Sequence, residues 1–214
     1  MTLRPTIRRA ANPATITRHL LLTASLLGSA IPAFAQDPAQ IQMWFEGGRL
    51  QQVVDAAMPD SSPEVLFLAA QAQQKRNAPD AASALYAQLA ARPASDPWGA
   101  IGESGQALLA GDPEAALASA QRAVAINGDL MEAQFQLGLV RARRLEWPAA
   151  ATAFDRAAEL DPGYAYAHYY GGLAHYRANR PDRMAIHFEQ FLKAAPEAPE
   201  RAEVTQIMRT VRGR

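Results

Sequence analysis

The stretch MEAQFQLGLVRARRLEWPAAATAFDRAAELDPGY, from Met131 to Tyr164, decides the fold. It divides into two apolar-periodic segments of about 14 residues, each typical of an amphipathic helix. The small residues Gly138 and Ala150 lie where two paired helices would cross, and Phe154 can fill the gap toward a following pair. One such pair cannot bury its apolar face alone, so the stretch predicts further pairs stacked against it.

The same pattern recurs along the chain at a spacing of 34 residues. Rows of this length start at Pro63, Pro97, Met131 and Ala165 and need no gaps. An unbroken period of this size indicates a stacked array of similar units, because each row supplies one supersecondary unit. The eighth position of the four rows is always small: Ala70, Ser104, Gly138 and Gly172.

The row pattern resembles that of the tetratricopeptide-repeat (TPR) family, which favours a small residue at position 8, Ala at 20, an aromatic at 24, Ala at 27 and Pro at 32. The third row carries Gly138, Ala150, Phe154, Ala157 and Pro162 at these positions. The chain departs from the pattern at Glu103, where Leu is usual, and at Met184 and Phe191, which replace alanines. The resemblance implies an all-α fold, a TPR α-solenoid of stacked antiparallel helix pairs with a C-terminal capping helix.

Capping signals mark where these helices should begin. Ser62, Asp96 and Asp112 each precede a proline, which favours a capping side chain followed by proline at the first helical position. The predicted organisation is a signal peptide (1–35), a degenerate leading helix pair (36–62), four TPR rows (63–96, 97–130, 131–164 and 165–198), and a capping helix with a basic tail (199–214).

The first residues predict export. A segment with Arg4, Arg8, Arg9 and Arg18 and no acid precedes an apolar run, 20–31, and then small residues at 33 and 35. This is the order of a secretory signal peptide, with cleavage expected between Ala35 and Gln36. The apolar run is shorter than the roughly 20 residues needed to span a bilayer, although an uncleaved anchor is the alternative. We therefore expect a periplasmic or secreted protein with no membrane span after cleavage.

Charge and cysteine content limit the kinds of partner and the covalent links that this protein can have. Removing residues 1–35 lowers the basic residues from 21 to 17 and leaves all 21 acids, a net charge of about −4. A nucleic-acid partner is not expected, because phosphate binding needs a concentrated positive surface. The chain has no cysteine, which excludes disulfides and a lipidated N-terminal cysteine.

The resemblance also implies where a partner would bind. In the TPR family the first helices line a concave face, and ligand contacts come from positions 2, 5, 9, 12 and 13 of each row. Here those positions are rich in aromatic and basic residues, the composition of interaction hot spots. The candidate partner-binding residues are Phe67, Lys75, Trp98, Phe135, Arg143, Tyr166, Tyr169, Tyr176 and Arg177.

Two interpretations of these residues remain open. They could form a groove for an extended or helical peptide, with Arg143 and Arg177 pairing to its acids. Alternatively, the aromatic side chains pack on the terminal caps or on each other.

The sequence shows no catalytic set. His168 and His175 lie seven residues apart, about 10 Å along one helix, and no third ligand for a metal shared with His187 is evident. Asp155 is expected to be solvated, and Glu103 is expected to pair with Arg141. We therefore expect no enzyme, no metal and no cofactor.

The expected function is a periplasmic adaptor or scaffold that binds a protein or peptide partner whose identity the sequence does not give. The alternative is a structural subunit of an envelope, secretion or division complex, which would use its convex face or its basic C-terminal tail.

Overall fold

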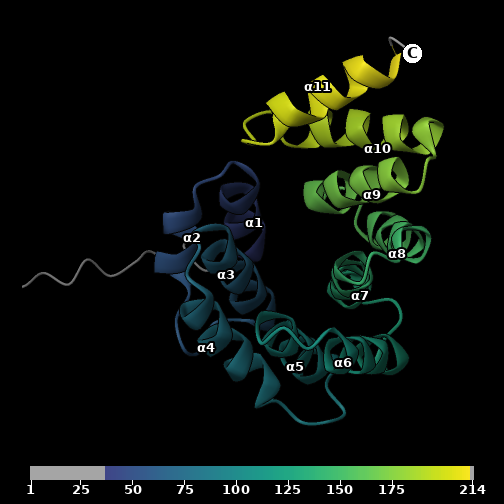
Figure 1. Ribbon diagram of the computed structural model, residues 1–214. Coiled ribbons are helices and arrows are strands. Elements are labelled where there is room, and N and C mark those ends of the chain that lie inside the picture. The colour runs from purple at the N-terminus through teal and green to yellow at the C-terminus, as the bar shows by residue number, and fades with distance from the viewer. Residues whose placement is uncertain (1–36, 213–214) are drawn as a thin grey trace, which may run out of the picture. The chain divides into compact units, whose positions relative to one another are not determined.

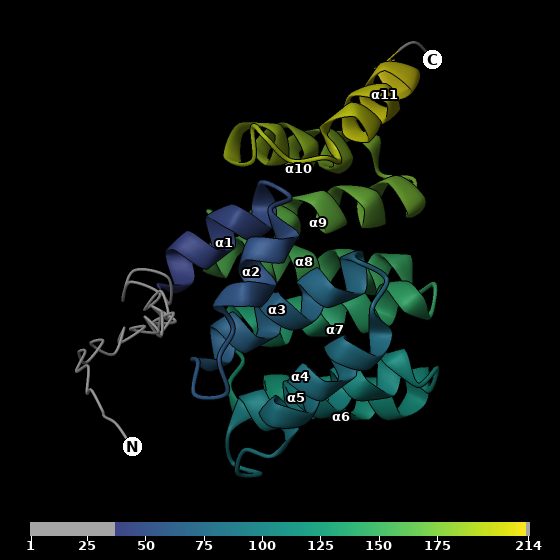
Figure 2. The ribbon, with the colours of Figure 1, turned by 90° about the vertical axis from the view of Figure 1, so that its left-hand side faces the viewer.

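The computed structural model describes residues 37–212, which form eleven α-helices and no strand. Figures 1 and 2 show the helices following one another in pairs, with α11 lying on α10. The helices are α1 (Pro38–Glu46), α2 (Leu50–Ala56), α3 (Pro63–Lys75), α4 (Pro79–Ala90), α5 (Pro97–Leu109), α6 (Pro113–Ile126), α7 (Met131–Arg143), α8 (Trp147–Leu160), α9 (Ala165–Arg177), α10 (Pro181–Ala194) and α11 (Arg201–Arg212).

Each row of 34 residues holds one helix pair, and local chemistry explains its ends. Asp96 and Asp112 accept hydrogen bonds from the backbone N–H groups of Trp98 and Ala115, which satisfies N–H groups that have no partner within the helix. The turn inside every row contains one residue with positive φ, which reverses the chain direction. These residues lie 34 apart: Asn77, Gly111, Leu145 and Asn179.

The small residues at position 8 let the two helices of a row approach closely. A Cβ atom on Gly138 would lie 2.6 Å from the ring of Phe154, and one on Gly172 would lie 2.4 Å from the ring of Phe188. The aromatic side chain of the second helix therefore packs directly onto the backbone of the first. This packing and the consecutive helix pairs confirm the expected all-α solenoid.

The ends of the array are covered by additional helices. Val204 and Met208 of α11 are buried, and Arg201 donates to the carbonyl oxygens of Leu192 and Ala195 at the end of α10. At the other end, Phe45 of α1 and Val53 of α2 belong to the same core as the repeats.

The predicted signal peptide and its cleavage point lie outside the described residues. Within 37–212, none of the helices has both the length and the apolar character required to cross a membrane.

Candidate functional site

Most of the predicted partner-binding residues are buried inside the chain. The side chains of Phe67, Trp98, Phe135, Tyr166 and Tyr169 are between 0% and 8% exposed. Helices α3, α5, α7 and α9 bring these aromatics to one face, as expected, but that face is covered by other parts of the protein.

The aromatic rings pack on one another from row to row. The ring centroids of Phe67 and Trp98 are 5.9 Å apart, those of Phe67 and Phe135 6.4 Å, and those of Phe135 and Tyr164 5.1 Å. Tyr166 continues the series in contact with Tyr169, at 5.9 Å. These distances suit favourable edge-to-face contacts. The rings pack on each other, which is what the second interpretation of the sequence expected.

The leading helix pair also covers this face. The ring of Phe45 in α1 lies 5.0 Å from that of Tyr166, and the Glu46 carboxylate accepts a hydrogen bond of 2.8 Å from the backbone N–H of Ala165. Burial raises the pKa of Glu46 to about 7, although the hydrogen bond from Ala165 opposes the shift. A residue 119 positions away along the chain therefore contacts the start of α9.

Lys75 connects the first row to the capping helix. Its ammonium donates to the Tyr166 hydroxyl at 2.8 Å, forms an ion pair with Glu200 of α11, and lies 4.2 Å from the centre of the Tyr166 ring. The Tyr166 hydroxyl donates to the same carboxylate at 2.9 Å, and the Tyr169 hydroxyl donates to Glu203 at 3.1 Å. Burial and these adjacent carboxylates raise the pKa of both phenols above their usual range. The polar side-chain atoms of Lys75, Tyr166 and Tyr169 therefore have partners within the protein.

The remaining three predicted residues lie at the carboxyl ends of α7 and α9 and are more accessible than the aromatic row. Arg143 ends α7, while Tyr176 and Arg177 end α9. The Arg177 guanidinium lies 5.9 Å from the ring centre of Trp147. Tyr176 lines a cavity of about 230 Å³ together with Asn179, Pro181 and Val211. This end of the repeats is the accessible part of the predicted site.

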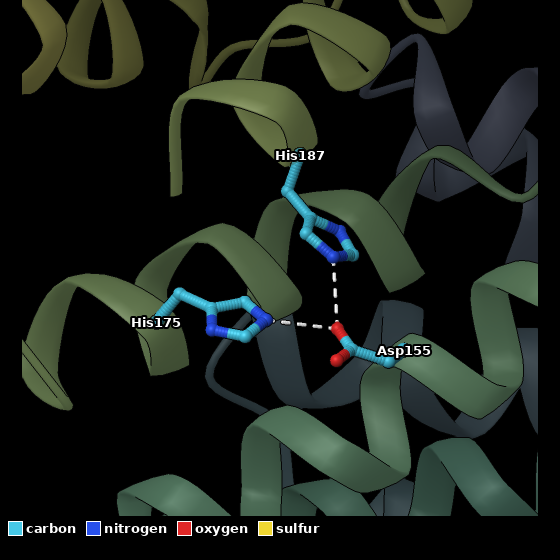
Figure 3. Close-up of side chains that lie close together, drawn as sticks. All are labelled: Asp155, His175 and His187. Carbon is cyan, nitrogen blue, oxygen red and sulfur yellow. Dashed lines mark hydrogen bonds and ion pairs between the residues drawn. The ribbon is translucent and has the colours of Figure 1, made fainter. Parts of the chain in front are cut away.

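A second group of side chains lies between the third and fourth rows (Figure 3). Asp155 of α8 projects toward His175 of α9 and His187 of α10, and its Oδ1 lies 2.9 Å from the Nε2 atom of each. The two histidines are buried, whereas the Asp155 side chain is 31% exposed. The three donor atoms lie within 4.8 Å of one another, so these residues could hold a metal ion.

A third histidine extends this group. His168 Nδ1 lies 3.3 Å from His187 Nδ1, and His168 Nε2 lies 3.3 Å from the carbonyl oxygen of Pro162. Burial would raise the pKa of Asp155, but the hydrogen bonds to His187 and His175 lower it below its usual value.

The expectation that no third ligand faces the histidines is wrong, because Asp155 meets both of them. The residue lies at position 25 of its row, whereas His175 and His187 lie at positions 11 and 23 of the next. The sequence does place polar residues on helices that pack between rows. The 34-residue period does not show which residues of adjacent rows face each other, so it could not bring these three together.

The predicted ion pair between Glu103 and Arg141 does not form. Glu103 pairs with Arg122, and Arg141 donates to the Ala149 carbonyl oxygen.

Comparison with known proteins supports the fold. No protein-family model matches the chain, and neither does any curated protein. Among solved structures, TTC0263, a thermophilic TPR protein of Thermus thermophilus, has a TM-score of 0.54 and 20% identity, covering 82% of this chain and 97% of its own. YrrB, a TPR protein with an unusual peptide-binding site, has a TM-score of 0.50 and 18% identity, covering 79% and 88%.

The 34-residue period, the glycine–aromatic packing within each row and these structural matches point to one architecture. Residues 37–212 of this chain have the fold of a tetratricopeptide-repeat α-solenoid.

Proposed function

We propose that this protein is an exported adaptor or scaffold that binds a protein or peptide partner at the accessible carboxyl ends of its first helices. The proposed binding residues are Arg143, Tyr176 and Arg177. Export to the periplasm or beyond rests on the signal-peptide pattern of residues 1–35, and the binding role rests on the TPR fold and on this surface.

One observation carries the choice of surface: of the nine predicted partner-binding residues, these three are the ones with exposed side chains. Lys75, Tyr166 and Tyr169 already contact Glu200 or Glu203 within the chain. A partner could reach them only by displacing α11, which would break buried polar contacts.

The accessible residues have the chemistry of a recognition site. Tyrosine and arginine are enriched in binding hot spots, and a guanidinium can bind a carboxylate through two parallel hydrogen bonds. Two arginines on neighbouring first helices therefore favour an acidic segment. Tyr176 and its adjoining cavity would receive an apolar side chain of that segment. YrrB, which has the same fold, has a peptide-binding site, and this supports the proposal at the level of fold.

The test is a crosslinking pull-down from the cell envelope with the full chain. The surface variant combines Arg143→Ala, Tyr176→Ala and Arg177→Ala. The control variant, Arg122→Ala with Arg156→Ala, removes two arginines from the second helices α6 and α8. Circular dichroism establishes that both variants remain helical.

Loss of a discrete partner in the surface variant, with retention in the control, is the expected result. If the control loses the partner and the surface variant keeps it, the proposed surface is wrong. The working surface would then be the face of the second helices, as expected for a structural subunit.

A further inference from the structure

We propose that Asp155, His175 and His187 form a binding site for one divalent transition-metal ion, with Zn²⁺ the best fit. The three residues come from α8, α9 and α10, so a bound ion would join the third row to the fourth. This site is separate from the proposed partner-binding residues and does not depend on them.

The spacing of the donor atoms suits one ion. Zinc binds imidazole nitrogen and carboxylate oxygen at about 2.1 Å, so tetrahedral geometry places neighbouring ligand atoms about 3.4 Å apart. Here Asp155 Oδ1 lies 2.9 Å from each Nε2 atom, and no two of the donor atoms are more than 4.8 Å apart. The separation of about 3.4 Å that tetrahedral zinc requires lies between 2.9 Å and 4.8 Å, so small side-chain movements would bring the three donor atoms into tetrahedral positions.

The surrounding hydrogen bonds orient His187 as a ligand. The Pro162 carbonyl oxygen can only accept, so its contact with His168 places a proton on His168 Nε2. Neutral His168 then has a bare Nδ1, which accepts from His187 Nδ1–H. His187 Nε2 faces the Asp155 carboxylate at 2.9 Å, with a proton between them where they form a hydrogen bond. A metal ion would take the place of that proton and bind both atoms.

This arrangement matches a general feature of metal-binding histidines. The ring nitrogen that does not bind the ion usually donates its proton to a fixed acceptor, which sets the ring orientation and the tautomer. His168 is that acceptor for His187, and it is therefore a positioning residue. The second ligand, His175, lacks such an acceptor, because its buried Nδ1 has no hydrogen-bond partner among the described residues; its Nε2 is directed at Asp155.

The donor set favours zinc over magnesium or calcium. Two imidazoles and one carboxylate are borderline ligands that suit Zn²⁺, whereas Mg²⁺ and Ca²⁺ prefer oxygen ligands throughout. The partly exposed Asp155 side chain leaves an approach from solvent, where water can complete the coordination. Because both histidines are buried, the ion would stabilise the packing of the two rows.

The experiment uses the full chain stripped of metal with a chelator. Isothermal titration with ZnCl₂ gives the stoichiometry and affinity, and thermal melting with and without ZnCl₂ gives the stabilisation. The variants are Asp155→Asn, His175→Gln and His187→Gln, with Asp182→Asn as an exposed carboxylate control on α10. X-ray absorption at the zinc edge reports the number of imidazole ligands.

We expect one zinc ion per chain, two imidazole ligands, and a rise in the melting temperature. Each ligand variant should bind at least about tenfold more weakly, while Asp182→Asn should bind as the parent chain does. The His168→Gln variant should keep the stoichiometry but lose about tenfold in affinity. The proposal is overturned if the unaltered chain binds no zinc, or if the ligand variants bind it as tightly as the Asp182→Asn control.

Discussion

The second and fourth rows share one backbone pattern but differ in what holds them. In the second row, α6 buries the small side chains Ala116, Ala120 and Ala123, and the ion pair of Glu103 with Arg122 is exposed. In the fourth row, α9 and α10 bury the aromatic side chains of Tyr166, Tyr169, Phe188 and Phe191 together with three histidines. The 34-residue period gives both rows the same pair of helices. The side chains determine how many other parts of the chain each row contacts.

This difference shows which row of the array makes contacts beyond its immediate neighbours. A solenoid row normally contacts only its neighbours. The second row contacts the first and third rows, as between Trp98 and Phe67 and between Ser104 and Gln136. The fourth row also contacts Glu46, Lys75 and Glu200, which lie in or beside α1, α3 and α11. Four predictions use this comparison, beginning with the largest expected effect.

Substituting two glycines, Gly102 where α5 packs on α4 of the preceding row and Gly172 where α9 packs on α10 of the same row, should separate backbone contacts from side-chain contacts. A Cβ on Gly102 would lie 2.4 Å from the backbone nitrogen of Ala90, whereas one on Gly172 meets the ring of Phe188. Gly102→Val should lower the free energy of unfolding by about 4 kcal/mol, because backbone cannot rotate away. Urea denaturation measures the loss.

The matched variant lies in the fourth row. Gly172→Ala should also destabilise, but adding Phe188→Leu should restore part of the loss because the smaller side chain leaves room. Adding Leu89→Ala to Gly102→Val should not restore stability, because the clash there is mainly with backbone. A recovery as large as that in the Gly172→Ala, Phe188→Leu variant would contradict the difference between the two sites.

Part of the pH dependence of stability should originate in Glu46, which contacts the start of the fourth row. Burial raises the pKa of Glu46 to about 7, so folding favours the protonated carboxyl. Below about pH 4.5 both folded and unfolded states are protonated. Stability should then fall as the pH rises from about 4.5 to about 7, by roughly 3 kcal/mol, and level off above that. Glu132, whose pKa burial also raises to about 7, acts in the same direction.

The Glu46→Gln variant should remove the Glu46 share of this decline. Denaturant midpoints measured from about pH 4 to about pH 8 give the comparison. Glu103→Gln, at the exposed carboxylate of the second row, is measured beside it as the control. An unaltered slope in Glu46→Gln would show that the α1–α9 contact does not carry the effect.

Breaking the ion pair that lies beside Tyr166 of the fourth row and the ion pair within the second row should have unequal effects. Lys75→Met removes the partner of Glu200 and Tyr166, whose polar atoms are mostly shielded from water, and should lower the free energy of unfolding by about 2 kcal/mol. Arg122→Met removes an exposed partner of Glu103 and should cost less than about 1 kcal/mol. Thermal melting at low and high salt distinguishes them. Similar losses would remove the contrast between the rows.

The smallest expected effect concerns a polar contact that belongs to the second row. Ser104 Oγ donates to the Ala116 carbonyl oxygen and accepts from Gln136 Nε2, each at 3.0 Å, and both side chains are fully buried. Ser104→Ala should lower the free energy of unfolding by about 1 kcal/mol, since it removes the hydrogen-bond partner of the buried Gln136 Nε2. The Ser104→Ala, Gln136→Leu double variant should recover part of this loss in the same denaturation assay.

The sequence was sufficient to predict the all-α repeat fold. The small residues and the aromatics at fixed positions determine how closely the two helices of one row pack. It was not sufficient to choose between an open groove and packed aromatics. Periodicity shows that Phe67, Phe135 and Tyr166 share a face but does not show what covers it. The covering contacts join residues far apart along the chain, such as Tyr166 with Glu200 and Phe45 with Tyr166.

The cluster of Asp155 with His175 and His187 was missed for a related reason. Each residue alone is an ordinary helical polar residue, and their meeting depends on the rotation and displacement between adjacent rows. That stacking geometry arises from the shapes of many buried side chains, so no local motif encodes it.

The hydrogen bond between Glu46 and the first N–H of α9 has a consequence for how the protein melts. Tyr164, which precedes α9, supplies no side-chain hydrogen bond to the start of the helix, so the distant carboxyl group serves instead. Repeat arrays usually fray from their ends, because each end has only one neighbour. Here the first segment cannot detach without exposing the start of α9. Opening at one end therefore weakens the other, and unfolding becomes a single cooperative transition in place of gradual fraying.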